Sequence, residues 1–535
     1  MPEQIFRVGY VLAKGSVSLP YLRLKGLAES SGDYSLTLIQ IDEKRQSARS
    51  FVASRLEAGI LSLEIWVLSH CPKYRALLKE SHFPGAQCPA NPMIPRDQKL
   101  ERLYASNLLD PLLSRFDLLV LGLGASPSEV DTRSMPPKGI LSIKAIDEKT
   151  GRSSQNFAHD ALTNGDASIG FEVTWQHPGD PHESTVLRGY LPTAPFACLN
   201  LVRVGTKASA LLHQTLKKIS QGGTLDDLGR SGDGSIHLQQ SSSTFCYVAC
   251  VSKRLIKSKI LRLMGLVRSR EVGYQRDRNH ASDFSNHTEV PNPLSRFRAD
   301  PFVIRFNERT ICYVEEHDNS GSAASINALE LTPEGCFELG TVLRESCHLS
   351  FPWIVESDGK LFMCPETLGL NEIRLYQCRH FPLEWSHHRT LISNVRAADT
   401  TLFLHEGRWW LLTNLDSADI GEYESELHIF YADKLDSESW TPHPKNPVII
   451  DSRIARNGGL LLRSGAIYRV RQKYGYLSYG AGISLAKIET LTPSEFHEVT
   501  VTDFENCSQL GNQGVHTLSM AGNIRFFDYV SMSRP

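Results

Sequence analysis

The hydrophobic pattern of residues 1–220 alternates between short apolar runs and amphipathic segments. Apolar runs typical of strands occur at 5–12, 35–41, 116–124 and 139–143, and helical patterns occur at 20–30 and 100–113. This alternation predicts a doubly wound α/β domain with a parallel sheet. Farther along, 170–176 and 185–191 predict an antiparallel pair, and 207–220 predicts a closing helix.

From residue 298 the pattern changes to short apolar or aromatic runs, each closed by a turn. The dipeptide Asp358-Gly359 lies between two such runs, which is a strong hairpin signal. Similar units recur around Gly407 and Gly465. Repeats of roughly 45–55 residues predict a β-propeller with one four-stranded blade per repeat. About five blades are expected over 298–535, with starts near these residues: Asp300, Ser350, Asp399, Ala455 and His516.

Acidic residues lie at or near several of the expected strand ends. A propeller brings the starts of its innermost strands to the mouth of a central channel, so residues far apart in the sequence converge there. Asp300, Glu366 and Asp399 lie in such places. One alternative is that each acid is only a turn former. The distinctive sequence pattern around each of the three favours a shared site.

Several motifs of this part resemble one known family. They are Ala299-Asp300-Pro301-Phe302, His348 to Pro352, Pro365-Glu366-Thr367, Asp399-Thr400-Thr401, 427–433, 440–448, Ala455-Arg456 and His516-Thr517. Together they resemble the N-terminal propeller domain of plant glucosamine inositolphosphorylceramide transferases and its bacterial relatives. The resemblance implies a fold related to the five-bladed propellers of arabinanases, invertases and levansucrases. Those enzymes cleave or transfer sugars with converging carboxylates.

The resemblance to propeller glycosidases also implies roles for the three acids. Asp300 would be the base or nucleophile, Glu366 the general acid, and Asp399 would orient the sugar or tune a pKa. Glycosyl transfer needs one carboxylate to attack or to activate the attacker and one protonated carboxyl to help the leaving group. Two carboxylates that face each other in a partly dry funnel have their pKa values pushed apart. Glu315 and Glu316 are further, weaker candidates.

Five other residues are predicted to bind the substrate. Arg456 would bind a phosphate or carboxylate in bidentate fashion. His348, Trp353 and Trp409 would form a platform for a sugar ring, and the alternative for a tryptophan in a propeller strand is a place in the core. Gln472 keeps a family position, whereas the next residue is a lysine where relatives carry an acid. That change predicts altered specificity or reduced activity.

The region 1–220 resembles methionyl-tRNA and sugar formyltransferases in layout. The resemblance is carried by the strand Phe116 to Gly124 and by the strand that ends at Lys144. Active formyltransferases have Asn-x-His at the exit of the second strand, and here the exit continues to Asp147 without a histidine. Without that histidine nothing obvious stabilises a tetrahedral intermediate. We therefore predict a degenerate formyltransferase-like domain, with Asp147 and His159 as surface residues.

Residues 221–297 are predicted to be a linker that contains one basic amphipathic segment. Residues 253–270 carry many lysines and arginines, with Leu255, Leu263, Leu266 and Val267 near one side. Such a segment can lie on an anionic membrane surface, which makes peripheral membrane contact a candidate interaction. The alternative is a helix packed between domains, with its basic face in water.

Composition excludes several classes of protein. The net charge of −2 gives no general basicity, so no nucleic-acid partner is expected. No apolar run is long enough to predict a transmembrane helix, and the N-terminal sequence predicts no signal peptide. The 11 cysteines form no CxxC pair, which favours reduced thiols in the cytoplasm. Neither a metal site at Cys246 and Cys250 nor a cofactor is expected.

These observations predict a carbohydrate-active, glycosyltransferase-like enzyme of surface-glycan or glycolipid biosynthesis. Its substrate would be a sugar, a sugar nucleotide or a lipid-linked glycan, and it would be cytoplasmic, with contact at the inner membrane face as a further option. In the plant relatives a separate domain is understood to carry the named activity, so the family name does not transfer as an activity. Two alternatives stay open: a non-catalytic glycan-binding or scaffold protein, and an acyl or formyl transfer enzyme with unrecognised residues.

Overall fold

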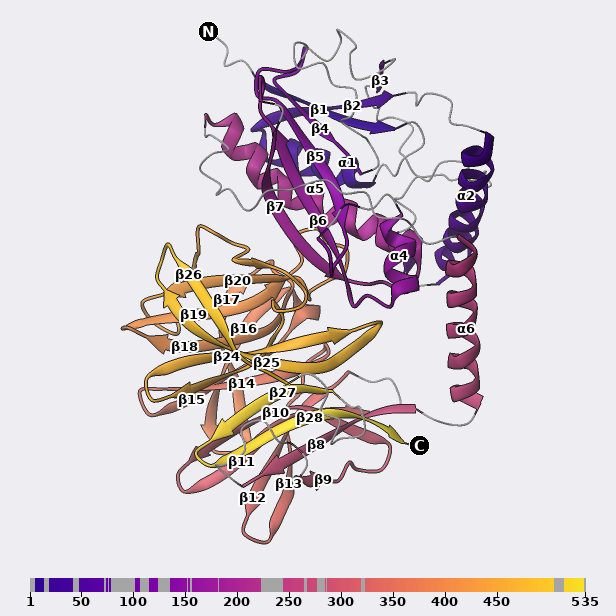
Figure 1. Cartoon of the computed structure of the whole chain (residues 1–535). Helices are drawn as coiled ribbons and strands as arrows, with labels where there is room; N and C mark the ends of the chain where they lie inside the picture. The colour runs from indigo at the N-terminus through magenta and orange to yellow at the C-terminus, as the bar shows by residue number, and fades with distance from the viewer. Residues whose placement is uncertain are drawn as a thin grey trace. The chain divides into compact units, whose positions relative to one another are not determined.

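The computed structural model divides the chain into two compact units (Figure 1). One unit consists of Met1–Leu255 with Ser417–Ile420, and the other of Ile256–Asp416 with Gly421–Pro535. The structure describes residues 5–13, 19–41, 48–71, 74, 75, 77, 102–105, 115–123, 135–151, 153, 156–180, 182–222, 244–263, 267–276, 284, 286–318, 323–504 and 514–533. Among these residues, no helix is both long and apolar enough to cross a bilayer.

The first unit is built on a 7-stranded sheet with the order β3-β2-β1-β4-β5-β6-β7. Its strands are β1 (Phe6–Ala13), β2 (Tyr34–Ile41), β3 (Arg102–Ala105), β4 (Leu118–Leu121), β5 (Ile140–Ile146), β6 (Ser168–Gln176) and β7 (Glu183–Pro192). The strands β1 to β5 pair in parallel, whereas β6 and β7 are antiparallel. The predicted parallel sheet and antiparallel pair are thus confirmed. The formyltransferase-like layout stays a prediction.

Helices accompany this sheet. They are α1 (Leu19–Ser31), α2 (Ala48–Ser69), α4 (Phe157–Asn164), α5 (Ala197–Ser220) and α6 (Thr244–Leu263). The first turn of α5 finds partners for its free N–H groups, because Ala197 N donates to Tyr247 Oη at 3.1 Å and Cys198 N donates to Glu64 Oε2 at 3.1 Å. The helix predicted at 100–113 was wrong for 102–105, which form β3. There the free edge of β2 offers a parallel partner, and this pairing overrides the helical periodicity.

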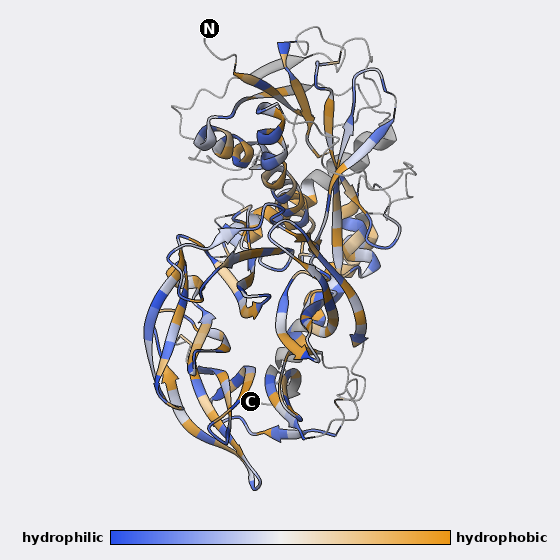
Figure 2. Ribbon diagram, turned by 90° about the vertical axis from the view of Figure 1, so that its left-hand side faces the viewer, coloured by the Kyte–Doolittle hydropathy of each residue, from blue (hydrophilic) through white to orange (hydrophobic). Residues whose placement is uncertain are grey.

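The second unit consists of short antiparallel sheets. Its strands are β8 (Val267–Gln275), β9 (Thr288–Val290), β10 (Arg296–Phe306), β11 (Arg309–Asp318), β12 (Ser325–Thr332), β13 (Gly335–Leu343), β14 (Ser350–Ser357), β15 (Lys360–Glu366), β16 (Glu372–His380), β17 (Glu384–Ser393), β18 (Ala397–His405), β19 (Arg408–Leu415), β20 (Glu426–Ala432), β21 (Thr441–Pro442), β22 (Ile449–Ile450), β23 (Asn457–Arg463), β24 (Ala466–Gly475), β25 (Ser478–Leu491), β26 (Phe496–Phe504), β27 (Val515–Ala521) and β28 (Ile524–Ser533). They form five sheets, four of four strands and one of five. The first strands of the sheets (β10, β14, β18, β23 and β27) contact one another in cyclic order. This arrangement is the predicted five-bladed propeller, seen around its axis in Figure 2.

The fifth blade closes the ring with strands from both ends of the unit. Its order is β27-β28-β8-β9, and β28 pairs with β8 from Val267 to Gln275. The predicted linker over 221–297 was therefore wrong for 267–275 and 288–290, which are blade strands. Tyr274 stacks on Phe526 at 5.3 Å between ring centroids, and this apolar contact holds the outer strand in place.

Two-residue turns join the first and second strands of each blade. Asp358-Gly359, Glu406-Gly407 and Ser464-Gly465 all have positive φ at both positions, as type I′ turns require. Their flanking residues pair directly across the hairpin. The hairpins predicted at these three places are thus confirmed.

Each inner strand also carries a β-bulge near its start. The register shifts fall at these residues: Asp300, Phe351, Asp399, Gly458 and His516. Asp300, Phe351 and Asp399 have φ values of 48°, 47° and 46°. Bulges bend a strand and re-aim its side chains. In blade four the bulge needs glycine, because a Cβ on Gly459 (φ 129°) would lie 2.5 Å from Leu518 O of the next blade.

Candidate active site

Hydrogen bonds around the propeller axis connect each bulge with a neighbouring blade. Phe351 N of blade two donates to Asp300 Oδ2 at 3.1 Å, and Asp300 N donates to Asp528 Oδ2 of blade five at 3.2 Å. Asp300 is only 4% exposed. Its carboxylate is therefore fixed by residues from both adjacent blades.

Glu366 and Asp399 come into direct contact, as the predicted convergence requires. Asp399 N donates to Glu366 Oε2 at 3.2 Å. Glu366 is half-buried, whereas Asp399 is 3% exposed. Burial, followed by the charge of Asp399, raises the pKa of Glu366 to about 8, and Asp300 contributes in the same direction. Glu366 is therefore a carboxyl group that keeps its proton at neutral pH.

Two polar side chains of blade four bind the carboxyl group of Asp399. Arg456 Nε lies 2.5 Å and Gln472 Nε2 2.7 Å from Asp399 Oδ2. Asn457 Nδ2 donates to the backbone oxygen of Asp399 at 2.8 Å. Burial raises the pKa of Asp399, Arg456 lowers it, Asp300 raises it, and the net shift is upward. Arg456 and Gln472, predicted to bind substrate, thus bind Asp399 in this structure.

His516 joins Asp300 to Asp528. Its Nδ1 lies 3.2 Å from Asp300 Oδ1 and 3.1 Å from Asp528 Oδ2, and Arg270 Nη1 lies 3.3 Å from Asp528 Oδ2. Burial and Arg270 lower the pKa of His516, but the two carboxylates more than offset them, so the net shift is upward. Burial raises the pKa of Asp528, but His516, Arg270 and the N–H of Thr517 together hold it well below its usual range.

The same three residues have the spacing of a metal site. Among the residues that the structure describes, Asp300, His516 and Asp528 are the group whose ligand atoms lie within 4.8 Å of one another. The raised pKa of His516 favours its imidazolium form, and Arg270 adds a guanidinium beside Asp528. A divalent ion would have to displace the imidazole proton and share the site with a guanidinium. The donor set therefore fits a metal ion poorly.

His348 and Glu315 form a second acid–base pair. His348 Nε2 lies 3.0 Å from Glu315 Oε1, and the His348 side chain is 46% exposed. The bond to Glu315 raises the pKa of His348 despite its partial burial. Burial raises the pKa of Glu315, which His348 lowers and Asp300 raises, with a net upward shift. Glu315 pairs with Ala299 next to the bulge, as Glu366 pairs with Ser350 in blade two.

The two tryptophans predicted to stack on a sugar lie elsewhere. Trp353 is 9% exposed and Trp409 is 6% exposed, and both belong to the main apolar core of the propeller. The indole N–H of Trp353 donates to Leu402 O in the next blade at 2.7 Å. These side chains fill the space between blades, so we no longer count them as candidate sugar contacts. His348 is the exposed member of the predicted platform.

Sequence reasoning missed part of this arrangement. Asp528 was not among the predicted site residues, and Arg270 was assigned to the amphipathic segment. A signal for His516 was present, since His516-Thr517 is one of the family motifs. Asn457 gave no signal of its own, although its side chain is fully buried and bonds to Asp399.

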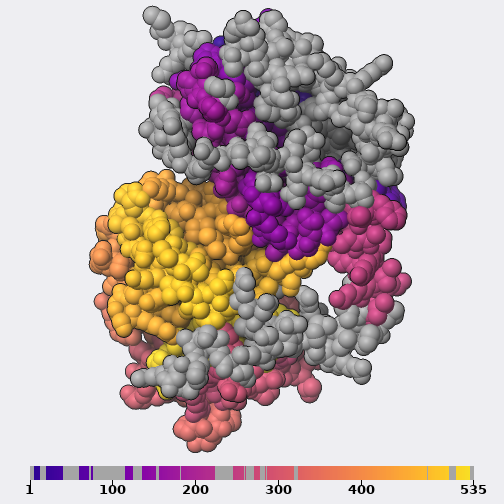
Figure 3. Space-filling view, in the orientation of Figure 1, coloured from indigo at the N-terminus to yellow at the C-terminus, as the bar shows by residue number. Residues whose placement is uncertain are grey.

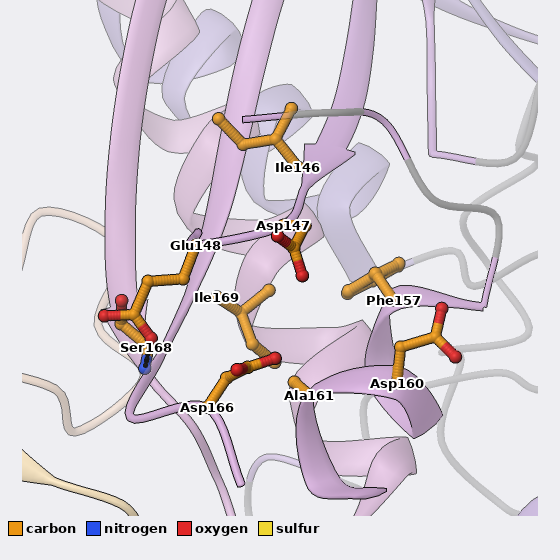
Figure 4. Close-up of a pocket in the computed structure, with 9 residues that line it drawn as sticks. All are labelled: Ile146, Asp147, Glu148, Phe157, Asp160, Ala161, Asp166, Ser168 and Ile169. Atoms are coloured by element: carbon orange, nitrogen blue, oxygen red, sulfur yellow. Dashed lines mark hydrogen bonds between the residues drawn. The ribbon is translucent and has the colours of Figure 1, made fainter. Parts of the chain in front are cut away.

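A small pocket lies at the exit of β5 in the N-terminal unit (Figure 4). Its interior of about 10 Å³ has room for one water molecule. The acids around it have local partners: Asp147 accepts Thr150 N at 2.8 Å, Glu148 accepts Ser168 N at 3.0 Å, and Asp166 pairs with Lys149 at 2.6 Å. These acids stabilise the local loops. His159, predicted to be a surface residue, is buried beside Tyr247.

Residues 284–517 match the family model described as "Glucosamine inositolphosphorylceramide transferase 1, N-terminal". The matched segment contains the bulges of all five blades, from Asp300 to His516. The protein called glucosamine inositolphosphorylceramide transferase 1 in Arabidopsis thaliana is 32% identical over 212 residues, which are 39% of this chain and 27% of that protein. Its namesake in Oryza sativa subsp. japonica is 33% identical over 212 residues, 39% of this chain and 28% of that protein. The chain thus spans about a quarter of the length of these relatives.

Solved structures with some likeness include sugar-cleaving propellers. An exo-1,5-α-L-arabinanase from a bovine ruminal metagenomic library has 11% identity and a TM-score of 0.32, over 40% of this chain and 86% of that chain. A family 117 glycoside hydrolase from Zobellia galactanivorans has 13% identity and a TM-score of 0.32, over 49% and 90%. At these scores the likeness carries no argument, and the propeller assignment rests on the five sheets themselves.

Proposed function

We propose that the second unit is a carbohydrate-active propeller that performs glycosyl transfer at the junction of blades one, two and three. Asp300 acts as the base or nucleophile, Glu366 as the general acid, and Asp399 as the fixed charge that controls Glu366. The observation that carries this proposal is the pKa of Glu366, which is raised to about 8 beside two other carboxyl groups held by different blades.

The proposed chemistry assigns different roles to Glu366 and Asp300. Glycosidic cleavage needs a proton donor on the leaving oxygen and an anion on the other side of the sugar carbon. Glu366 is half-buried and protonated at neutral pH, so it can meet a substrate and donate. Asp300 lies beside His516, whose Nδ1 is 3.2 Å from Asp300 Oδ1, and this position makes it the candidate for the second carboxyl group, which attacks or activates the attacker.

The name of the matched family supports a proposal for the substrate class. The relatives are named for transfer of glucosamine to inositolphosphorylceramide, and the match covers only the segment named N-terminal. We therefore place this chain in glycolipid or surface-glycan biosynthesis, with a sugar, a sugar nucleotide or a lipid-linked glycan as substrate. His348, which is exposed and bonded to Glu315, would contact such a substrate.

One observation favours a non-catalytic glycan-binding role instead. Asp399 is almost fully buried, and one of its carboxylate oxygens accepts hydrogen bonds from both Arg456 and Gln472. A buried acid with such partners can stabilise the fold without taking part in catalysis. A binding protein would use the same ring to hold a sugar without cleaving it.

The test is a screen of nucleotide sugars and of aryl pyranosides and furanosides with the full chain, followed by two isosteric variants. Asp300→Asn and Glu366→Gln should each reduce turnover by at least about a hundredfold, because each removes one half of the acid–base pair. Sugar affinity, measured by calorimetry, should change by less than about threefold, because the shape of the site is kept.

Glu330→Gln is the matched control. Glu330 forms an ion pair with Arg309 in blade one and should leave turnover unchanged. Full turnover in both the Asp300 and the Glu366 variants would reject the catalytic roles. Sugar binding by the wild type without turnover of any donor would select the glycan-binding role.

A further inference from the structure

One face of the helix α6 is anchored to the first unit, to which its residues up to Leu255 belong. Tyr247 is buried and its hydroxyl bonds to Glu64 of α2. Cys250 Sγ donates to Leu162 O at 3.3 Å, and Arg254 donates to Pro195 O. The three residues follow each other at helical spacing, so they define a single inward face.

The opposite face of α6 is apolar and open to solvent. Phe245 is 79% exposed, Ile256 60% and Ile260 50%. At about 100° per residue the three side chains lie within about 60° of one another and about 180° from Tyr247. They form a stripe that we call the outer stripe. Figure 3 shows α6 at the surface of the molecule.

Lysines flank the outer stripe on both sides. By the same helical geometry, Lys253 and Lys257 lie on one side of it and Lys259 on the other, and all three are exposed. The helix contains no aspartate or glutamate. Among the described residues, no carboxylate forms an ion pair with these three lysines. The outer stripe therefore combines apolar side chains with uncompensated positive charge.

We propose that the outer stripe of α6 docks on an anionic membrane surface. Apolar side chains between lysines can enter the boundary of the acyl chains while the ammonium groups meet lipid phosphates. A second copy of this chain fits less well, because a two-fold contact would place lysines against lysines with no acid to compensate them. The segment predicted at 253–270 was wrong for 267–270, which belong to β8. The apolar side predicted for it differs from the outer stripe: Leu255 is exposed on α6, Val267 is in β8, and Leu263 and Leu266 lie outside the described side chains.

This docking does not depend on the chemistry of the propeller. Docking would bring a glycosyl-transferring unit close to a lipid-linked substrate. The proposal of docking, however, depends on α6 alone. Loss of membrane binding therefore leaves the turnover of a soluble sugar donor unchanged, and loss of turnover leaves membrane binding unchanged.

The test is flotation of the full chain with phosphatidylcholine vesicles that contain or lack phosphatidylglycerol. The wild type should bind only the anionic vesicles, and salt should weaken the binding. Lys253→Gln/Lys257→Gln/Lys259→Gln should reduce partitioning on the order of 100-fold, at about 1 kcal/mol per lysine. Phe245→Ser/Ile256→Ser/Ile260→Ser should reduce it by at least about tenfold, because apolar burial is lost.

The helix α2 provides a matched control. Leu63 and Val67 are exposed and apolar, but no lysine or arginine lies among its described side chains at 59–69. Leu63→Ser/Val67→Ser should leave vesicle binding within about twofold of the wild type. Three results would overturn the proposal: no binding to anionic vesicles, equal binding by the α6 variants, or a wild-type dimer that Ile256→Ser converts to a monomer.

Discussion

Carboxyl groups gather at two places in this chain, the exit of β5 and the axis of the propeller. At the β5 exit the partners are near in the sequence: Asp147 accepts from Thr150 in its own loop, and Asp166, just after α4, pairs with Lys149, just before it. At the propeller axis the partners come from other blades. Asp300 and Asp528 are 228 residues apart in the sequence, and Asp399 and Gln472 are 73 apart.

This difference separates two uses of an acid. An acid with local partners fixes a turn and needs nothing beyond its own loop. An acid with distant partners is oriented by the whole fold, and burial together with neighbouring charges can shift its pKa. A cluster of acids is therefore weak evidence for a functional site. Stronger evidence is that the residues bound to those acids come from distant parts of the chain.

The largest expected effect comes from His516→Ala. The substitution leaves Asp300 and Asp528 as buried carboxylates without the imidazolium between them, and should reduce the free energy of unfolding by about 3–5 kcal/mol. Urea unfolding measures this loss. Asp147→Ala at the β5 exit should cost only about 1 kcal/mol, because it removes hydrogen bonds of an exposed turn.

The sign of the pH dependence sharpens this prediction. The pKa of His516 is raised above 6.5 in the folded protein, so its stabilisation is complete below 6.5 and is lost as pH rises through the raised pKa. The difference in unfolding free energy between wild type and His516→Ala should therefore narrow at alkaline pH. Equal losses of unfolding free energy in the His516 and Asp147 variants would show that acids at the propeller axis and at the β5 exit do not differ in this way.

A smaller effect is expected for Trp353→Leu. Trp353 also takes its partner from another blade, since its indole bonds to Leu402 and its ring meets Phe302 edge-on at 5.4 Å. Loss of this buried ring should reduce the unfolding free energy by about 2–3 kcal/mol and leave sugar affinity within about twofold. Calorimetry with a bound sugar checks the second value. A tenfold loss of affinity at unchanged stability would restore Trp353 to the sugar platform.

The sequence was sufficient for features that depend on neighbours in the chain. Asp358-Gly359 predicts its hairpin because a type I′ turn needs positive φ at both positions. The repeat of such hairpins predicts the propeller, and the motifs around Asp300 and Asp399 locate two of its bulges. These are local rules, and the structure confirms the fold that they predict.

The sequence was insufficient where distant strands meet. Nothing local indicates that Arg270 of β8 lies 3.3 Å from Asp528 of β28, because only closure of the ring brings these strands together. The same holds for β3, whose residues have a helical pattern but pair with the free edge of β2. Trp353 was ambiguous because a sugar platform and a core between blades use the same residue type.

The smallest expected effect, and the most specific, is the pH dependence of the Glu366 contribution. The folded pKa is about 8 against an ordinary value of 4.5, so folding favours the protonated acid. The stabilisation is complete below 4.5 and is lost as pH rises through about 8. Glu366→Gln keeps the shape and is never charged. The wild type should therefore lose on the order of 1–2 kcal/mol relative to Glu366→Gln between about pH 7 and about pH 9 in urea unfolding. Glu330→Gln should show no such relative change, because its ion pair with Arg309 lowers the pKa of Glu330 and leaves nothing to titrate in this range.

A difference between wild type and Glu366→Gln that does not vary with pH would mean that Glu366 is ionised like an ordinary surface acid. The propeller axis would then hold its acids no differently from the β5 exit.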